Sequence, residues 1–449
     1  GMLDAIEDAA KKAGVTLGKA DKNTLNVIVK DLPKNASYDV VVIGAGGAGF
    51  SAAIEAKNAG ANVVLLEKMP QVGGNSLISG AEMNVARNWV QPKLGITDDS
   101  PELHAKDTYL GGDKKGDMNV INVMTRNALA GAEWCRNYLG IRFEPDNLFF
   151  FGGHSRKRAL IPVGHTGTEF ITKFLAKADE LGIPVITNMK AEELLKDKTG
   201  RVVGVKATMN GTEYTFNAKG GVVLATGGFG ANPAMVKKYN PKIDERFKTT
   251  DAPGTTGEAL YMAQRAGAEL VNMQYIQTYP ICDPISGVIE LIADARFDGA
   301  IMLNQEGKRF VEELGRRDVL SEAILDQTGG YCWVLWNDKI GAVSNTVKEH
   351  PTEYDAFTKQ GIMTTCPDLK CIADFTKIPY DSLKGTVDRV TSMAGKGNDK
   401  DFHHRAGLVD MSQGQYYVIK AVPSVHHTMG GVRINEKAQA LTADGKVIP

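Results

Sequence analysis

Residues 38–67, YDVVVIGAGGAGFSAAIEAKNAGANVVLLE, decide the fold. The segment opens with a short, almost wholly apolar run over 38–43, which is typical of a strand buried on both faces. The next six residues, GAGGAG, fit the G-x-G-x-x-G pattern, whose glycines allow a tight turn, a close approach to a pyrophosphate and close packing of helix on strand. The residues expected to bind the cofactor here are Gly44, Gly46, Gly47, Ala48 and Gly49.

The rest of this stretch completes a strand–helix–strand unit. Residues 50–59 predict a helix that ends at Gly60, and residues 62–66 predict the second strand. Phosphates would lie against the exposed N–H groups at the positive end of the helix. Glu67 ends the second strand, where an acid can accept both hydroxyls of an adenosine ribose, and Lys68 beside it completes the expected contact. An acid at this position favours FAD or NAD over NADP.

The whole-chain composition indicates an ordinary globular enzyme of more than one domain. The chain has 449 residues, of which 43% are apolar and 23% charged, and its net charge of −1 gives no electrostatic reason to expect nucleic acid as a partner. No apolar stretch is long enough to span a bilayer, so membrane insertion is not expected. The five cysteines are scattered without metal-site spacing, and we expect free, mostly buried thiols and no metal.

Two turns follow the dinucleotide pattern. Residues 73–76 read GGNS, and residues 79–84 read SGAEMN. Small residues there suit a backbone that wraps around a bulky cofactor, although a pair of ordinary loops is the structural alternative. Contacts to the pyrophosphate are expected from Gly74, Asn75 and Ser76, and contacts to a flat ring system from Gly80 and Ala81.

Farther along, the pattern predicts an α/β fold. Helices are expected over 117–139 and 168–181, with an irregular segment over 145–165 between them. Short strands separated by hairpin turns fill 184–225, which indicates a parallel sheet interrupted by a β meander. The last strand leads into Ala225, Thr226 and Gly227, where we expect another close approach to the cofactor.

The predicted fold class is a Rossmann-like cofactor-binding domain with an inserted β meander, plus an α+β capping domain. Residues 1–37 are expected to form a short helix and linker, 38–270 the cofactor-binding domain, 271–423 the capping domain, and 424–449 a return to the first domain.

Five motifs together resemble the soluble fumarate reductase family of FAD proteins. They are VVVIGAGGAGFSAAI, GGNS, ATGGFGAN, EGKRFVEELGRRD and HHTMGGV, and the match covers nearly the whole chain. The resemblance implies FAD as cofactor, a 2-enoate as substrate, and either an attached FMN domain, which this sequence lacks, or a separate protein as electron donor. It also implies a periplasmic enzyme, although no signal peptide follows Gly1 and Met2.

The resemblance assigns the proton chemistry to arginines. In this family hydride from the flavin reaches the β carbon of the enoate and an arginine protonates the α carbon, which maps to Arg317. Arg296, Arg316 and Asp318 are candidates for the relay that reprotonates it. Without the resemblance, a structural ion pair between Arg317 and a neighbouring aspartate would be the better interpretation.

Substrate contacts are expected from four other side chains. His426 and His427 resemble the histidines that hold the substrate carboxylate, and the sequence leaves open which one does so, with His427 preferred. Fumarate-reducing members carry a histidine where this chain has Tyr279, and Tyr279 with Asp294 resembles the urocanate-reducing members. Asp294 would accept a hydrogen bond from an imidazole and repel a dianion such as fumarate.

The resemblance is incomplete at the C-terminus. Family members continue past the position of Pro449 with segments that contact the flavin and a second carboxylate-binding arginine. We therefore expect this chain to bind FAD weakly or to hold only its ADP portion. The alternatives that remain are reduction of fumarate or an aryl acrylate, a non-catalytic module that binds ADP or FAD, and an NAD-dependent dehydrogenase.

Overall fold

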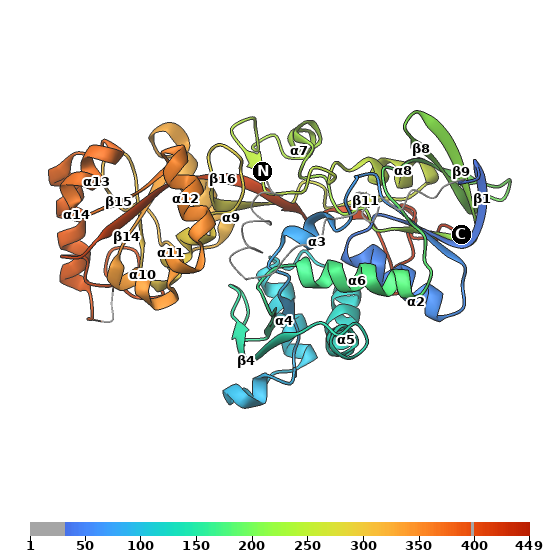
Figure 1. Cartoon of the computed structure of the whole chain (residues 1–449), viewed down its shortest axis with the longest axis horizontal. Coiled ribbons are helices and arrows are strands. Elements are labelled where there is room, and N and C mark those ends of the chain that lie inside the picture. The colour runs from blue at the N-terminus through green and yellow to red at the C-terminus, as the bar shows by residue number, and fades with distance from the viewer. Residues whose placement is uncertain (1–31, 397–398) are drawn as a thin grey trace, which may run out of the picture. The chain divides into compact units, whose positions relative to one another are not determined.

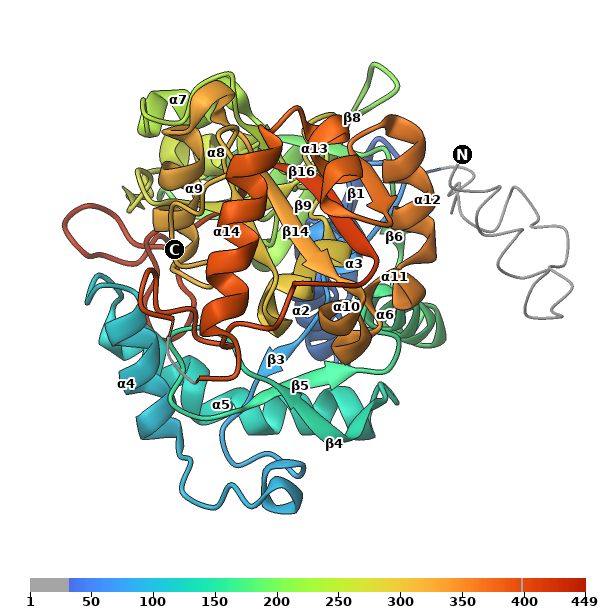
Figure 2. The same cartoon turned by 90° about the vertical axis from the view of Figure 1, so that its left-hand side faces the viewer.

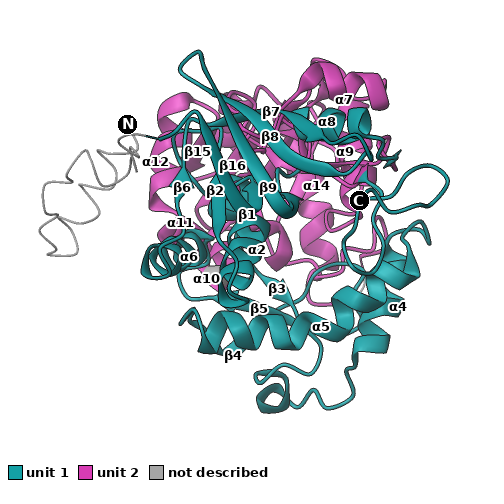
Figure 3. Ribbon diagram, turned by 90° about the vertical axis from the view of Figure 1, so that its right-hand side faces the viewer, with its two compact units in different colours: residues 1–227, 258–270, 432–449 teal, residues 228–257, 271–431 magenta. Residues whose placement is uncertain are grey.

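The computed structural model describes residues 32–396 and 399–449, which form two compact units (Figure 3). Unit 1 comprises residues 1–227, 258–270 and 432–449, and unit 2 comprises residues 228–257 and 271–431. The helix predicted near the N-terminus lies outside the described residues. The structure thus groups residues 228–257 with the second unit, and the functional domain boundaries given above stay a prediction.

Unit 1 is built on a six-stranded sheet. Its strands, in spatial order, are β6 (Val185–Ile186), β2 (Val63–Leu66), β1 (Asn35–Ile43), β9 (Thr212–Leu224), β8 (Val202–Met209) and β7 (Lys190–Lys196). The first four strands are parallel, and β7 and β8 are antiparallel additions. This is the predicted Rossmann-like sheet with its β meander. Two of the predicted short strands are parts of the single long strand β9.

Apolar runs place these strands inside. All four residues of β2 are buried, and so are the last three residues of β1. Helix α2 (Gly47–Asn58) packs against β1 and β2 through Phe50, Ala53 and Ile54. Burial of the strands on both faces explains why they read as continuous apolar runs rather than alternating ones.

The remaining elements of unit 1 surround this sheet or form a smaller one. The other helices are α3 (Gly74–Ile78), η1 (Gln91–Leu94), α4 (Pro101–Gly111), α5 (Met118–Asn137), α6 (Thr168–Glu180) and α8 (Glu258–Ala266). A small sheet has the order β3 (Met83–Asn84), β5 (Ala159–Pro162) and β4 (Phe143–Phe149). The prediction that 145–165 is irregular was therefore wrong in part, because buried residues such as Leu148 and Leu160 pair across β4 and β5.

Unit 2 is organised around the long strand β16 (Tyr416–Thr428), as Figures 1 and 2 show. Its partner strands are β10 (Lys248–Thr249), β12 (Ile276–Cys282), β14 (Cys332–Asn337) and β15 (Met363–Cys366), and β13 (Ile301–Leu303) pairs with β14. All these pairings are antiparallel except that of β10. Unit 2 thus has its own mixed sheet, in agreement with the predicted α+β class.

Helices cover the sheet of unit 2, and α12 to α14 gather around β14 and β15 (Figure 2). The helices are α7 (Pro233–Tyr239), η2 (Leu291–Asp298), α9 (Arg317–Leu325), η3 (Thr328–Gly330), α10 (Asp338–Ser344), α11 (Thr346–Glu349), α12 (Pro351–Gln360), α13 (Leu369–Thr376) and α14 (Tyr380–Met393). The last pair of short strands is β11 (Leu270–Val271) with β17 (Gly431–Val432).

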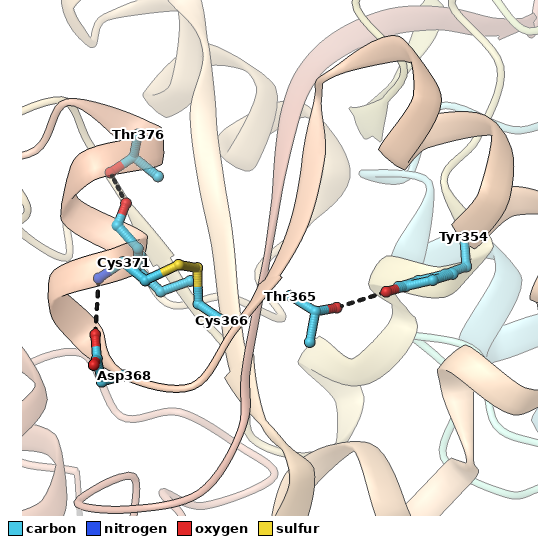
Figure 4. The surroundings of a disulfide bond; sticks show 7 residues. Tyr354, Thr365, Cys366, Asp368, Cys371 and Thr376 are labelled. Carbon is cyan, nitrogen blue, oxygen red and sulfur yellow. Dashed lines mark hydrogen bonds between the residues drawn. A yellow bond between two sulfur atoms is a disulfide. The ribbon is translucent and has the colours of Figure 1, made fainter.

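Two cysteines of unit 2 form a disulfide, which corrects the prediction that all five thiols are free. Cys366 ends β15 and is bonded to Cys371 in the first turn of α13 (Figure 4). Asp368 lies between them and caps α13 by accepting a hydrogen bond from the Cys371 amide. Cys135, Cys282 and Cys332 are free and buried, as predicted.

Candidate active site

Two glycines of the 44–49 segment, Gly44 and Gly49, are required by close backbone approaches. A Cβ on Gly49 would lie 1.7 Å from the carbonyl oxygen of Gly44, and a Cβ on Gly44 would lie 2.4 Å from that of Ala225. Gly44 also has a φ of +102°, which only glycine adopts readily. Helix α2 can therefore begin directly against the ends of β1 and β9, as the sequence pattern predicted.

The start of α2 presents unused backbone donors. Gly46 precedes the helix without a capping side chain, and the first bond of the helix is from the Phe50 amide to the Gly46 carbonyl. Among the described residues, the amides of Gly46, Ala48 and Gly49 have no acceptor. Free N–H groups at the positive end of a helix form a site that favours phosphate.

Glu67 ties the end of β2 to this loop. Its carboxylate accepts hydrogen bonds from the amides of Ala45 at 2.9 Å and Met69 at 2.8 Å. Two carboxylate oxygens accept about four hydrogen bonds, so acceptor capacity remains for the hydroxyls of a ribose. The neighbouring Lys68 instead forms an ion pair of 2.9 Å with Glu258.

The 73–76 turn packs against the same loop, because the Gly73 amide donates to the Ala45 carbonyl. Gly74, Asn75 and Ser76 are the first residues of α3, so the predicted turn is in fact a short helix. The Ser76 hydroxyl accepts a hydrogen bond of 3.0 Å from the Gly47 amide, which places it at the start of α2. Gly80 and Ala81 follow α3, and Ala81 adopts a left-handed φ of +56°.

Ala225, Thr226 and Gly227 leave β9 beside the start of α2. The Ala225 amide donates to the Ile43 carbonyl at 2.8 Å, so this segment continues the pairing of β9 with β1. In the sheet, β1 lies between β2, which is the next strand in the sequence, and β9, which comes much later in the chain. Ligands of α/β sheets bind at such a switch point, at the carboxyl ends of the strands. The 44–49 loop, Glu67, the 73–76 segment and Ala225 are thus joined by backbone and side-chain hydrogen bonds at the ends of β1, β2 and β9, and their chemistry fits the ADP portion of FAD. Among the described residues, no hydrogen bond joins Gly80 or Ala81 to this loop, and Lys68 pairs with Glu258.

A second cluster lies within unit 2 around Tyr279, whose ring is buried on β12. Arg296 of η2 donates a hydrogen bond of 3.2 Å from Nη2 to the Tyr279 hydroxyl, and its Nε lies 4.0 Å from Asp294 Oδ1. Cζ of Arg317 lies 4.6 Å from the centre of the Tyr279 ring, which is a cation–π distance. Burial raises the pKa of the Tyr279 hydroxyl, so the side chain stays protonated.

Arg317 is the first residue of α9 and is not paired with its neighbouring aspartate. Arg316 forms the ion pair with Asp318 instead, at 2.7 Å. Arg317 Nη1 donates to the side-chain oxygen of Gln277 at 2.6 Å. Burial lowers the pKa of Arg317, the Arg296 cation lowers it further, and Tyr279 and Asp294 oppose that shift.

A β-bulge brings the two histidines to the same cluster. Gln277 pairs with His427 and the next residue, Thr278, pairs with Val425, so His426 is the extra residue in β16. Bulges redirect a side chain, and here the His426 ring packs against both Tyr279, at 5.4 Å between ring centres, and His427, at 5.5 Å. The Thr250 hydroxyl lies 2.8 Å from His426 Nδ1. His426 is thus held on one side, whereas His427 is exposed at the surface.

Both histidines are poor bases in this setting. Burial, aided by Arg317 and His427, lowers the pKa of His426 to about 3. Loss of hydration beside the surrounding protein lowers the pKa of His427, and the Arg317 cation adds to this, although the residue as a whole is exposed. Each is therefore a neutral hydrogen-bonding ring at physiological pH.

Sequence reasoning did not single out Gln277 or Thr250. Gln277 could have been found, since it lies two residues before Tyr279 on one strand and alternate residues share a face. Thr250 could not, because its place beside His426 comes from the parallel pairing of β10 with β16. Within the described ranges, no three His, Cys, Asp or Glu side chains group as a metal site, and no helix has the length and apolarity to cross a bilayer.

Comparison with known proteins identifies relatives over the whole chain. A family model described as FAD binding domain matches residues 39–449. Urocanate reductase of Eggerthella lenta is 41% identical over 452 residues, covering 100% of this chain and 74% of the relative. A fumarate reductase (cytochrome) of Shewanella frigidimarina is 35% identical over 431 residues, covering 96% of this chain and 73% of the relative.

The fold also matches a solved structure. The open conformation of a flavocytochrome c3 fumarate reductase has a TM-score of 0.80 and 30% sequence identity, covering 96% of this chain and 74% of that chain. The agreement extends over both units, and therefore over the described residues that carry the dinucleotide segment and the Tyr279 cluster.

Proposed function

The chain belongs to the FAD-binding family that includes the soluble fumarate reductases, and from this premise we propose that it reduces urocanate to imidazole propionate. It is an FAD-dependent oxidoreductase that acts on a CH–CH bond, and its relatives reduce urocanate, fumarate or acrylate. The choice of urocanate among these 2-enoates is the proposal.

The observation that carries this choice is the Tyr279 cluster. Tyr279 accepts a hydrogen bond from Arg296, so its own O–H proton is directed elsewhere and can be donated to a ring nitrogen. Asp294, whose side chain is 37% exposed, supplies a carboxylate beside it for a ring N–H. Urocanate has an imidazole that offers both partners, whereas a second carboxylate in its place would be repelled by Asp294.

The carboxylate of the substrate, at the end opposite the imidazole, needs hydrogen-bond donors. His427 is exposed and lies on the same face of the sheet as Gln277 and Tyr279, so we propose it as the residue that holds the carboxylate. His426 supports it from the bulge. A neutral histidine donates one hydrogen bond to a carboxylate without the cost of burying a second charge.

Arg317 is proposed as the acid. Its guanidinium breaks an N–H bond as a C–H bond forms at the α carbon, and Arg296 is the proposed member of the relay that returns the proton. The hydride for the β carbon is supplied by reduced FAD when that cofactor is bound. Its ADP portion would be held by the amides of Gly46, Ala48 and Gly49 and by Glu67, and an FMN domain or a separate protein would supply the electrons.

The test is anaerobic oxidation of reduced methyl viologen by this chain after loading with FAD, with urocanate, fumarate and an aryl acrylate assayed in parallel. Because this chain is expected to bind FAD weakly, FAD is kept in excess, and we then expect turnover with urocanate at a kcat/KM well above that of the other two. Turnover with fumarate alone would overturn the choice of urocanate as substrate but would agree with reduction of a 2-enoate. Binding of FAD or ADP without any turnover would favour a non-catalytic module.

A further inference from the structure

Arg317 is held by an uncharged partner. Its Nη1 donates to Gln277 Oε1 at 2.6 Å, and its guanidinium carbon lies 4.6 Å from the centre of the Tyr279 ring. Among the described residues, it forms no ion pair with a carboxylate, since Asp318 is bonded to Arg316. Arg317 is partly buried, and a charge removed from water is normally compensated by an acid.

Gln277 lies on β12 opposite the start of α9, where Arg317 is located. Gln277 and Tyr279 are alternate residues of β12 and therefore project to the same face, toward the first turn of α9. Arg317 lies at the N-terminus of that helix, where the helix dipole disfavours a positive charge. Burial and the nearby Arg296 cation lower the pKa of Arg317, and the net shift is downward although Tyr279 and Asp294 oppose it.

A carboxylate in place of the Gln277 amide would reverse this balance. Hydrogen bonds between two ions are about twice as strong as those between neutral groups, and an adjacent negative charge favours the protonated guanidinium. Arg317 would then be well positioned, but its raised pKa would make it a weaker proton donor. An amide of the same shape fixes the guanidinium without that penalty.

We propose that Gln277 is a positioning residue whose uncharged amide orients Arg317 for proton donation without stabilising its cation. This inference rests on the proposed function in that Arg317 is the acid. In the reaction, the Arg317 N–H bond breaks and its proton forms the new C–H bond at the α carbon of the enoate. The arginine is left as a neutral guanidine and regains its proton through the relay.

The test compares Gln277→Glu, which keeps shape and acceptor but adds charge, with Gln277→Leu, which removes the acceptor. Gln360→Glu, an exposed position of α12, is the matched control for the added charge. We expect Gln277→Glu to lower kcat about tenfold or more, with KM little changed and a larger solvent deuterium isotope effect on kcat. Gln277→Leu should lower kcat by loss of orientation, and Gln360→Glu should match the wild type.

A second measurement, made without substrate, tests the effect of Gln277 on Arg317 whichever enoate the protein reduces. Exchange of the Arg317 guanidinium protons with solvent, followed by NMR and assigned through Arg317→Lys, is catalysed by base and slows when the cation is stabilised. We expect slower exchange in Gln277→Glu than in the wild type. Wild-type kcat together with unchanged exchange in Gln277→Glu would overturn the proposal. An absence of turnover in the wild type would count against the proposed function alone, because the exchange measurement would still decide the role of Gln277.

Discussion

Arg296 donates a hydrogen bond of 3.2 Å to the hydroxyl oxygen of Tyr279. An arginine has only donors, so this contact fixes the Tyr279 oxygen as an acceptor toward Arg296 and leaves its proton for another partner. Tyr279 and Arg296 are both buried, and the pKa of Tyr279 is raised. The pair therefore presents one oriented O–H group rather than a mobile one.

Asp294→Ala should impair the reduction of urocanate, which carries an imidazole, more than the reduction of an enoate without a basic ring. We expect kcat/KM for urocanate to fall by about tenfold to a hundredfold, because a hydrogen bond to a charged group contributes roughly 1.5–3 kcal/mol. Turnover of a non-basic enoate such as an aryl acrylate should be nearly unchanged. Steady-state kinetics with both substrates checks this, and an equal loss on both would contradict the role given to Asp294.

Arg317→Ala should abolish reduction while FAD stays bound. A general acid contributes on the order of a hundredfold to ten-thousandfold, and the alanine side chain has no proton to donate. Arg317→Lys keeps a cationic donor and should retain part of the activity. The check is turnover with FAD in excess, together with an FAD titration of the variant and the wild type, and turnover retained in Arg317→Ala would remove Arg317 from its role.

His426 should make the protein sensitive to acid. Its pKa is lowered from an ordinary value near 6.5 to about 3, so the unfolded chain binds more protons than the folded one between these values. Stability from this residue is fully present above about pH 6.5 and is lost as the pH falls toward 3. His426→Gln should flatten the dependence of melting temperature on pH in that window, whereas His403→Gln, at an exposed position, is the control.

The dinucleotide segment could be predicted from the sequence, because the residues that form it are close together in the chain. One apolar run, three spaced glycines and one acid specify the turn between β1 and α2 and its partner at Glu67. The Tyr279 cluster needed contacts that are distant in sequence. The bulge at His426, the contact of Arg317 with Gln277 and the pairing of β4 with β5 depend on strand register, which composition and periodicity do not determine.

The Cys366–Cys371 disulfide is expected to stabilise unit 2 by a modest amount. The bond closes a very short loop, so the entropy it removes from the unfolded chain is small, on the order of 2 kcal/mol. A reducing agent should therefore lower the melting temperature of the wild type by a few degrees and leave that of Cys371→Ser unchanged. A shift in Cys371→Ser as well would show that the reductant acts elsewhere.

Gly49→Ala should prevent the cofactor site from forming. The added Cβ would lie 1.7 Å from the Gly44 carbonyl oxygen, so the backbone of α2 or of the turn before it must shift. We expect a loss of about 3 kcal/mol or more in stability and of FAD binding, measured by thermal unfolding and by flavin fluorescence on titration. Gly131→Ala is the control, because its Cβ position in α5 faces open space beyond its own helix backbone and alanine favours a helix by up to about 1 kcal/mol. Normal FAD binding in Gly49→Ala would mean that the close packing of α2 on β1 is not what builds the pyrophosphate site.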